Sequence, residues 1–394
     1  MAVDAEQAQP PFGGRTGRRA LAGVALASAA ALALAACSGG APPGSSPAGA
    51  ASSAAGTAAP AAPASVPQTL SETGSSLMAP LFIKWWGPAY HTQFSQVTLN
   101  PRTSSSGQGI SSAAAGTVDI GASDAYLSPA TLARYPSLVN IPLAVAALMV
   151  IYHVPGLSFS MHLKLDGQVL AKIFSGQITR WDDPAIKRLN PTANLPTGLG
   201  IVLVHRGDVS GSTFLFTSYM NAQDPSGWSG SLIGTKVAWL EQPNEIAATG
   251  SDGINGITGK VKSNPGSIGY VGVSYLSEVR QDGEGEAELG NSAGNYVLPG
   301  PGTIQAALAS FTNTPASETI SLINGSAAQA YPIINYEYAV VNTSQPGATR
   351  AQDLRAFLYW AITRGTALLG DVNFQPLPPS VITLSEAQIA KIEG

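Results

Sequence analysis

The sequence predicts an α/β fold in which short buried strands alternate with helices and ligands bind where the strands end. Three observations support this class. A strand, a glycine-containing turn and a helix follow one another at residues 97–115, and the same succession returns at 201–220. A further strand at 118–124 ends in the polar turn Ser123-Asp124. Two long apolar segments, 141–152 and 331–341, have the composition of fully buried strands.

The first 36 residues have the composition of an export signal. Three arginines within residues 15–19 precede an apolar, alanine-rich run that ends in Leu34-Ala35-Ala36-Cys37. This ending resembles a bacterial lipobox, and Cys37 is the single cysteine of the chain. We therefore expect residues 1–36 to be a lipoprotein signal peptide and Cys37 to be lipidated. The alternative is a single transmembrane anchor, and the adjacent arginines leave both the general secretory and the twin-arginine export routes open.

The segment after Cys37 differs in composition from the rest of the chain. Residues 38–68 are almost entirely Ala, Ser, Gly and Pro, which bury too little apolar surface to offset chain entropy. We expect residues 37–68 to be a disordered tether and the remainder to be long enough for two domains. The formal net charge is −4 and only 11% of residues are charged, with Lys and Arg dispersed, which excludes a nucleic-acid partner.

The elements of the first domain can be taken in order from residue 69. A helix is expected to start at Ala79-Pro80, since proline is tolerated in a first turn, and Gly87-Pro88 should bend or end it. A strand at 97–99 leads into a glycine turn at 104–110 and a short helix through 113–115. The strand at 118–124 follows, and the apolar strand at 141–152, too short to span a membrane, takes the chain into a second domain.

The second domain is expected to repeat the pattern. An amphipathic helix from residue 170 stops at Gly176, and the β-branched run 201–204 is a buried strand followed by a helix to 220. A helix start at 250–253 and a short strand at 267–271 come next. The apolar strand 331–341 returns the chain to the first domain, which ends with helices at 351–363 and 386–392.

The segment 201–220 has the features of an anion site. The strand stops at Arg206 and the turn Ser210-Gly211-Ser212 opens the helix. First-turn N–H groups have no partner within a helix, and the helix dipole places partial positive charge there. The planar guanidinium of Arg206 suits a tetrahedral oxyanion. Taken alone, the segment also fits an ordinary helix cap beside a surface arginine.

Four separated stretches, 73–85, 105–124, 206–219 and 266–271, resemble one family, the PstS-like phosphate-binding proteins that serve the bacterial phosphate ABC transporter. The resemblance covers residues 69–394. It implies a type II-like periplasmic-binding-protein clamshell with the anion between two lobes. Lobe 1 would comprise residues 69–148 and 333–394, and lobe 2 residues 149–332.

The resemblance also implies a set of site residues. Asp208 would hold the arginine in place, and the phosphate would be bound by the side chain or backbone N–H of Ser76, Leu77, Ser106, Asp124, Arg206, Ser210, Gly211 and Ser212. The chain departs from the family at Ser76 and Ser212, where threonine is common, at Leu77, where an aromatic residue is usual, and at Val209, where glycine is frequent. The hydroxyls are retained, so these departures concern affinity rather than ligand class.

Asp124 is unusual among the implied phosphate-binding residues, because a carboxylate repels an anion. Its presence is explained if the ligand brings a proton, as phosphate does and sulfate at neutral pH does not. Simple turn or helix capping is the alternative role for Asp124, Ser76 and Ser106.

The function implied is extracytoplasmic capture of inorganic phosphate by a monomeric lipoprotein on the outer face of the cytoplasmic membrane. It would deliver phosphate to a membrane-embedded permease with separate ATPase subunits, since the chain has no Walker-type motif. No catalytic activity, metal or cofactor is expected. The alternatives are a secreted phosphoester hydrolase, disfavoured because no Gly-x-Ser-x-Gly elbow and only four scattered histidines occur, and a surface adhesin or signalling module. His205 is not expected to be catalytic.

Overall fold

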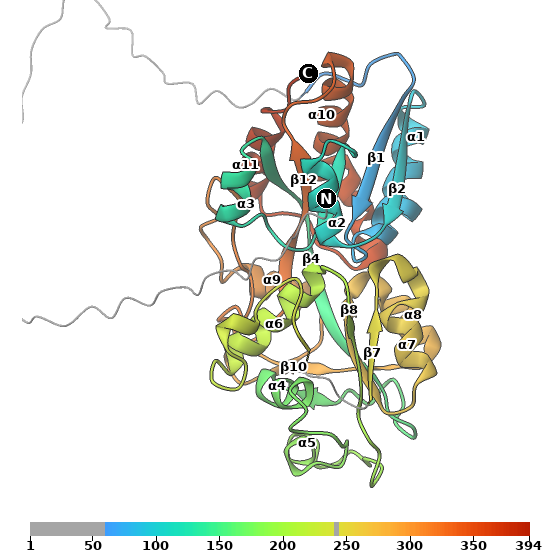
Figure 1. Ribbon diagram of the computed structural model, residues 1–394, viewed down its shortest axis with the longest axis vertical. Helices are drawn as coiled ribbons and strands as arrows, with labels where there is room; N and C mark the ends of the chain where they lie inside the picture. The colour runs from blue at the N-terminus through green and yellow to red at the C-terminus, as the bar shows by residue number, and fades with distance from the viewer. Residues whose placement is uncertain (1–59, 240–243) are drawn as a thin grey trace, which may run out of the picture.

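A computed structural model describes residues 60–239 and 244–394 of the chain (Figure 1). The expected signal peptide, Cys37 and most of the expected tether lie outside the described residues. Within them, the chain forms two lobes, one above the other in Figure 1. The upper lobe contains the strands β1, β2 and β3, and the lower lobe contains β6, β7 and β8.

The main sheet runs through both lobes. Its strand order is β2-β1-β3-β12-β4-β8-β6-β7, and β9 pairs with β4 at the side. The neighbours β2, β1 and β3 are parallel, as are β8, β6 and β7, whereas β12 and β4 are antiparallel to their neighbours and join the two parallel groups. The strands of this sheet are β1 (Gln68–Gly74), β2 (Val97–Thr103), β3 (Ile120–Ser123), β4 (Leu138–His153), β6 (Val202–Arg206), β7 (Glu245–Ala248), β8 (Ser267–Gly272), β9 (Gly285–Glu286) and β12 (Ile334–Asn342).

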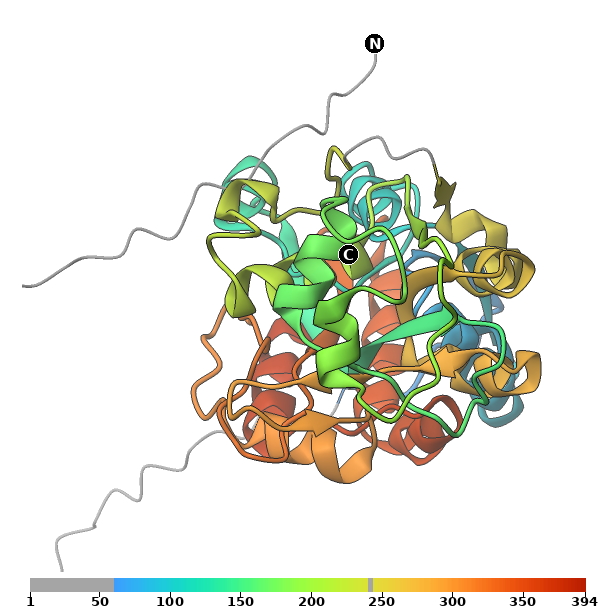
Figure 2. The same ribbon diagram turned by 90° about the horizontal axis from the view of Figure 1, so that it is seen from below.

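A small second sheet lies at the far end of the lower lobe. Its order is β11-β10-β5, formed by β5 (Lys164–Leu165), β10 (Glu288–Gly290) and β11 (Tyr296–Val297). Seen from below, the green segment that contains α4 and α5 lies in front of the red C-terminal helices of the upper lobe (Figure 2).

Helices cover the sheet in both lobes. In the upper lobe these are η1 (Leu81–Trp86), α1 (Gly87–Gln93), α2 (Ser106–Ala114), α3 (Pro129–Arg134), α10 (Ala348–Ile362), η5 (Arg364–Val372) and α11 (Pro379–Ile389). The others are α4 (Gly167–Phe174), α5 (Pro184–Leu189), α6 (Gly211–Gln223), η2 (Gly230–Leu232), η3 (Gly250–Asn255), α7 (Ile257–Ser263), η4 (Val273–Tyr275), α8 (Leu276–Asp282) and α9 (Pro301–Leu308).

The two-lobe α/β fold expected from the sequence is confirmed. The strands expected at 97–99, 118–124, 141–152, 201–204, 267–271 and 331–341 are present as β2, β3, β4, β6, β8 and β12. The lobe boundaries at residues 148/149 and 332/333 stay a prediction, because β4 belongs to both lobes: its first part pairs with β12 and its last part with β8.

At Gly87-Pro88, where the sequence predicts a bend or an end, the π-helical η1 ends at Trp86 and α1 begins directly at Gly87, which has helical angles (φ −58°, ψ −55°). A second expectation, on the extent of the tether, was wrong. The disordered tether was expected to reach residue 68. However, the Ala64 N–H donates to Asp353 Oδ1 at 2.7 Å and Gln352 Nε2 donates to the Ala62 carbonyl at 2.6 Å, so the segment just before β1 lies against α10.

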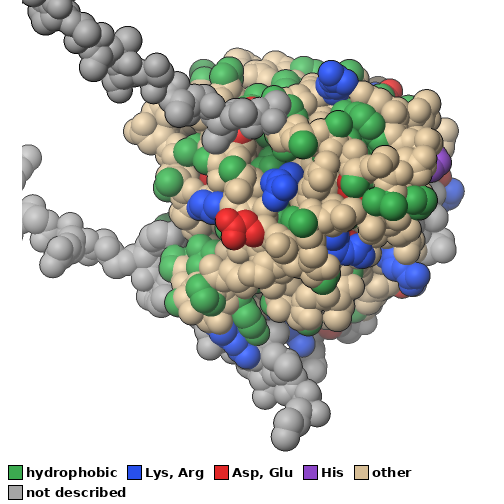
Figure 3. Space-filling view, turned by 90° about the horizontal axis from the view of Figure 1, so that it is seen from above, with side chains coloured by type: hydrophobic (Ala, Val, Ile, Leu, Met, Phe, Trp, Pro, Cys, Tyr) green, Lys and Arg blue, Asp and Glu red, His purple; other side chains and the backbone are tan. Residues whose placement is uncertain are grey.

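The core is continuous across the two lobes. The central strand β4 is buried from Asn140 to Tyr152, and β12 is buried from Ile334 to Val341. The register between them shifts at Glu337/Tyr338, which marks a β-bulge. None of the helices within residues 60–239 and 244–394 is long and apolar enough to cross a bilayer. On the upper face, the Lys and Arg side chains lie apart from one another and form no basic patch (Figure 3).

Candidate anion-binding site

The ends of β1, β3 and β6 meet between the two lobes. Gly74 ends β1 with φ +147°, an angle that L residues rarely adopt, and a Cβ at this position would collide with the Ala122 carbonyl of β3. The close approach of these two strands brings Ser75 and Ser76 next to Asp124, which follows β3 directly. The site is therefore built on rigid strand ends, as ligand sites of open α/β sheets are.

Ser75 organises the first turn. Its Oγ accepts hydrogen bonds from the Leu77 and Met78 N–H groups, both at 3.1 Å, and donates to Asp124 Oδ1. The capping role considered for Ser76 thus belongs to Ser75. The Leu77 N–H, expected to face the ligand, is bonded within the turn, and the Leu77 side chain is buried against Gly272 of the lower lobe.

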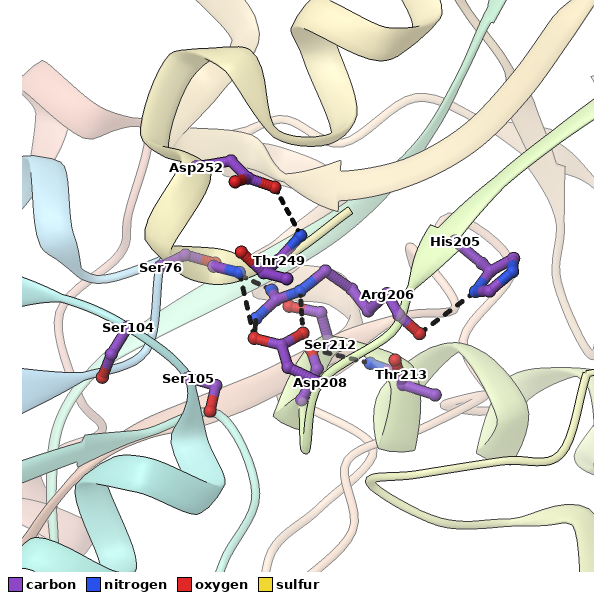
Figure 4. A network of polar contacts seen from close by, with 12 residues as sticks. Ser76, Ser104, Ser105, His205, Arg206, Asp208, Ser212, Thr213, Thr249 and Asp252 are labelled. Carbon is purple, nitrogen blue, oxygen red and sulfur yellow. Dashed lines mark hydrogen bonds and ion pairs between the residues drawn. The ribbon is translucent and has the colours of Figure 1, made fainter. Parts of the chain in front are cut away.

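Ser76 faces the other lobe. Its Oγ accepts a hydrogen bond from Arg206 Nη1 at 2.9 Å, and its carbonyl accepts one from the Tyr275 hydroxyl at 2.9 Å. Ser76 therefore contacts the residue that the sequence marks as the main cation of the site, as Figure 4 shows.

Arg206, at the end of β6, is held by a bidentate ion pair. Its Nε and Nη2 donate to Asp208 Oδ1 and Oδ2 at 2.6 and 2.7 Å, so the guanidinium is fixed in one plane (Figure 4). The Gly250 N–H donates to Asp208 Oδ2 at 3.0 Å and fixes the carboxylate in turn. The arrangement predicted for Asp208 and Arg206 is present. Arg206 is 6% exposed, so it is not the ordinary surface charge that the sequence left open.

Asp124 is buried and has hydroxyl partners. Ser212 Oγ donates to Asp124 Oδ2 at 2.7 Å, and Ser75 donates to the other oxygen. Burial is the main cause that raises the pKa of Asp124, while these hydroxyls and the charge of Arg206 act to lower it. The turn-capping role considered for Asp124 is taken by its neighbour Ser123, whose Oγ accepts from the Ala125 N–H at 3.1 Å.

The N-termini of α2 and α6 face each other across the lobes. Ser105, not Ser106, caps α2 by accepting from the Gln108 N–H, and Ser106 Oγ instead accepts from the Asp124 N–H at 3.2 Å. Ser210 caps α6 by accepting from the Thr213 N–H, which is the alternative role that the sequence left open for this segment. Gly211 follows it at the first helical position, where a Cβ would lie 2.6 Å from Ser106 Oγ. Only glycine permits this approach of the two helix ends.

A cavity lies beside this cluster. It is lined by residues of both lobes, among them Ser76, Leu77, Arg206, Ser212, Thr249 and Tyr270. Tyr270 lies within the stretch 266–271 that resembles the family, and the sequence gives it no separate role. Its hydroxyl accepts from the Arg206 N–H at 3.1 Å and bonds Thr213 Oγ1 at 2.8 Å, so it ties β6 to the start of α6.

Several residues of the site were not identified from the sequence. Ser75 and Tyr270 lie inside the stretches 73–85 and 266–271 that resemble the family, but the sequence does not indicate which bonds their hydroxyls form. The Thr249-Gly250 loop and Glu337 come from segments that the sequence singled out only as a helix start and a strand. Their place at the site depends on pairing between β6 and β7 and between β12 and β3, which no local pattern encodes.

His205 points away from the cluster in Figure 4. Its ring packs on Trp239 at 5.0 Å between centroids, and its Nδ1 contacts the Arg206 carbonyl. Among the described residues, no group of three or more His, Cys, Asp or Glu side chains is placed to hold a metal ion. The arrangement therefore offers one cation, several hydroxyls, helix N-termini and one carboxyl acceptor, a set suited to binding a small protonated oxyanion.

Comparisons with known proteins agree with this chemistry. A model of the PBP superfamily domain matches residues 52–364. The chain is 31% identical over 325 residues to the phosphate-binding protein PstS of Pasteurella multocida, covering 82% of this chain and 90% of that protein. It is 29% identical to PstS of Haemophilus influenzae, covering 81% and 92% of the two chains.

Solved structures share the fold. A high-affinity periplasmic phosphate-binding protein, PfluDING, bound with phosphate, has a TM-score of 0.64 at 20% identity and covers 81% of this chain and 93% of its own. A phosphate-binding protein from Stenotrophomonas maltophilia has a TM-score of 0.61 at 21% identity, with 82% and 93% covered.

Proposed function

The chain belongs to the PstS family of phosphate-binding proteins, within the PBP superfamily, and on that premise we propose that it captures inorganic phosphate between its two lobes for uptake by an ABC transporter. The observation that supports this most directly is the pairing of a fixed guanidinium, Arg206, with a buried carboxyl, Asp124, in one cluster of hydroxyls. These donors, together with one carboxyl acceptor, favour the binding of an anion that carries its own proton.

The ligands we propose for phosphate are Ser76, Leu77, Ser106, Asp124, Arg206, Ser210, Gly211 and Ser212, with Asp208 in support. Two existing bonds indicate how the site would rearrange. Arg206 donates to Ser76, and Ser212 donates to Asp124. A phosphate oxygen placed between the lobes would take over the donors of Arg206 and the serines, while a phosphate hydroxyl would donate to Asp124.

Calorimetric titration with phosphate and sulfate side by side tests this function. We expect one phosphate to bind per chain with sulfate showing no heat at the same concentrations. Equal affinity for the two anions, or no binding of either, would contradict the proposed phosphate-binding function.

The proposed ligands come from both lobes, with Ser76, Ser106 and Asp124 in the upper lobe and Arg206, Ser210 and Ser212 in the lower. Binding should therefore hold the lobes together. Small-angle scattering should show a smaller radius of gyration with saturating phosphate than without, and an identical profile under both conditions would contradict a site shared by two lobes.

We further propose that the chain is exported, acts as a monomer outside the cytoplasmic membrane and is anchored there through a lipid on Cys37. Its partner would be a permease with separate ATPase subunits. Replacing Cys37 with Ala should release the protein from the membrane fraction, and a variant that stays bound after a salt wash would refute the anchor.

We propose no enzymatic role, because the His205 side chain points away from the serines of the site. Turnover of a phosphomonoester by the purified chain would contradict this.

A further inference from the structure

Glu337 is a buried carboxyl directly behind the site. It lies in β12, inside the main sheet, with a side chain that is fully buried. The register between β12 and β4 shifts between Glu337 and Tyr338, and Tyr338 pairs with Ser123, the residue before Asp124. The pairing of β12 with β3 therefore places Glu337 next to the end of β3, where the site begins.

Asn335 links Glu337 to Asp124. Its Nδ2 donates to Glu337 Oε1 and to the Asp124 carbonyl, both at 3.0 Å. Continuing the antiparallel register of β12 and β3 by one residue sets Glu337 opposite Asp124, and each of the two carboxyls perturbs the pKa of the other. In the part of the chain that the structure describes, no amide, hydroxyl or cation donates to Glu337 Oε2. Two neighbouring buried carboxyls cannot both ionise without a large cost, so the pair favours keeping one proton.

The surroundings decide which carboxyl holds the proton. Asp124 receives hydrogen bonds from Ser75 and Ser212 and feels the positive charge of Arg206, all of which favour its ionised form. Glu337 receives one amide N–H, from Asn335, and its charged neighbour is Asp124 itself. Tyr338, the other ionisable neighbour, has a pKa raised by its own burial and stays neutral.

The direction of each pKa shift is consistent with this geometry. Burial and then the charge of Asp124 raise the pKa of Glu337 well above its ordinary value. Burial raises the pKa of Asp124 as well, but Ser75, Ser212, the charge of Arg206 and Glu337 act to lower it. These opposing influences favour the proton on Glu337 and the negative charge on Asp124.

We propose that Glu337 is a positioning and specificity residue of the phosphate site, which keeps Asp124 ionised by donating a hydrogen bond to it from behind. The inference rests on the proposed function. An ionised Asp124 can only accept, so it requires a ligand with a proton. If Glu337 could not donate, Asp124 would retain a proton of its own, and a protonated Asp124 would donate to a fully deprotonated anion such as sulfate. The discrimination between the two anions thus depends on a residue that touches neither.

Two substitutions separate this role from simple packing. Glu337→Leu fills the space without a donor, whereas Glu337→Gln keeps a neutral N–H donor that does not titrate. Competition of sulfate against labelled phosphate should show at least a tenfold loss of discrimination for Glu337→Leu, and Glu337→Gln should restore most of it. A matched control is Glu72→Leu, because Glu72 is also buried in the upper half of the sheet, in β1, but bonds no residue of the site.

The pH profile gives a second readout. Phosphate affinity of the parent should fall at high pH as Glu337 loses its proton and two charges face each other, and Glu337→Gln should shift this fall to higher pH. If Glu337→Leu folds poorly, the comparison of pH profiles between parent and Glu337→Gln still tests the proposed role of Glu337. The same discrimination in parent and Glu337→Leu, or the same pH profile in parent and Glu337→Gln, would overturn the inference.

Infrared spectroscopy of the ligand-free protein tests whether the Glu337 carboxyl is protonated. The difference between parent and Glu337→Gln at neutral pH should contain the carbonyl band of a protonated carboxylic acid. Absence of this band would refute the inference even if phosphate binds. Conversely, a parent that shows the band but fails to bind phosphate would refute the proposed function, and with it the role of Glu337 in selectivity.

Discussion

Two aspartates lie at the same site, and their surroundings give them different chemistry. Asp208, at the β6 end, uses both oxygens on the guanidinium of Arg206 and is partly exposed, with 21% of its side chain accessible. Asp124, at the β3 end, is 2% exposed and bonds hydroxyls, with a protonated carboxyl proposed behind it. A carboxylate that is committed to a cation fixes that cation, whereas one that faces hydroxyls remains an acceptor for a ligand's proton.

The largest effect is expected from removing the cation. In Arg206→Ala the anion would lose its buried charge partner, at a cost of about 2–5 kcal/mol. This corresponds to roughly a 30-fold to several-thousand-fold weaker affinity for phosphate. Titration calorimetry measures the change directly.

A matched control is Arg180→Ala, which removes an exposed arginine that also pairs with an aspartate, Asp182, on the surface. Its affinity should equal that of the parent. If Arg206→Ala stays within about threefold of the parent, which is under about 1 kcal/mol, the proposed role of Arg206 is excluded.

The next effect concerns selectivity at Asp124. Asp124→Asn removes the negative charge and adds N–H donors while keeping one acceptor oxygen. We expect phosphate affinity to change modestly and sulfate to become a competitor, because the site would no longer repel an anion without a proton. Competition of labelled phosphate with excess sulfate provides the measurement. A variant that rejects sulfate as firmly as the parent would show that Asp124 does not select the ligand.

A smaller effect is expected at Asp208. Asp208→Asn loosens the orientation of Arg206, which weakens binding, but it also leaves the cation uncompensated, which strengthens attraction for the anion. The two effects oppose each other, so we expect less than about a tenfold change in affinity. The uncompensated charge should also make binding more sensitive to salt, which titrations at low and high ionic strength would reveal. A loss as large as that of Arg206→Ala would mean that orientation, not charge, dominates.

The smallest effect concerns stability and pH, and it extends the comparison to buried carboxyls outside the site. Burial raises the pKa of Glu72 and Glu318 from an ordinary 4.5 to about 8, and that of Glu286 to about 7. These acids keep their protons in the folded chain where the unfolded chain has lost them. Their contribution to stability is therefore complete below about pH 4.5 and is lost as the pH rises through 7 to 8.

We therefore expect a lower Tm at about pH 8.5 than at about pH 6, by a few degrees, since 1 kcal/mol corresponds to roughly 2–4 °C in a large domain. Glu72→Gln, which cannot ionise, should flatten part of this dependence. Scanning calorimetry at both pH values makes the comparison. A Tm that rises with pH, or a slope unchanged in Glu72→Gln, would contradict the assignment.

The sequence predicted the strands better than it predicted the bonds of the residues at the strand ends. The strands β4 and β6 were found because a run of buried β-branched and apolar residues is a local signal. The positions of Arg206 and Asp208 followed from the resemblance, and their ion pair spans only two residues. By contrast, Ser75 and Ser76 have the same side chain, and only the three-dimensional turn decides which one caps the helix and which one faces Arg206.

Glu337 shows why the remainder could not be predicted. In the sequence it stands inside an apolar strand between two tyrosines, and nothing local relates it to Asp124, which precedes it by more than two hundred residues. The proximity arises from the antiparallel pairing of β12 with β3. The same limit applies to residues 60–67, whose composition predicts disorder although two hydrogen bonds hold them against α10.

The long strand β4 also has a mechanical consequence. It runs for sixteen residues through both lobes without a glycine and is paired with β12 and then β8. Engineers call such a jointless connection a flexure: it bends along its length, with no surfaces that slide. Any swing of one lobe against the other would be spread over many small backbone rotations in β4 and β12. A flexure also resists twisting and sideways travel, so the two faces of the site would return to the same alignment after each opening.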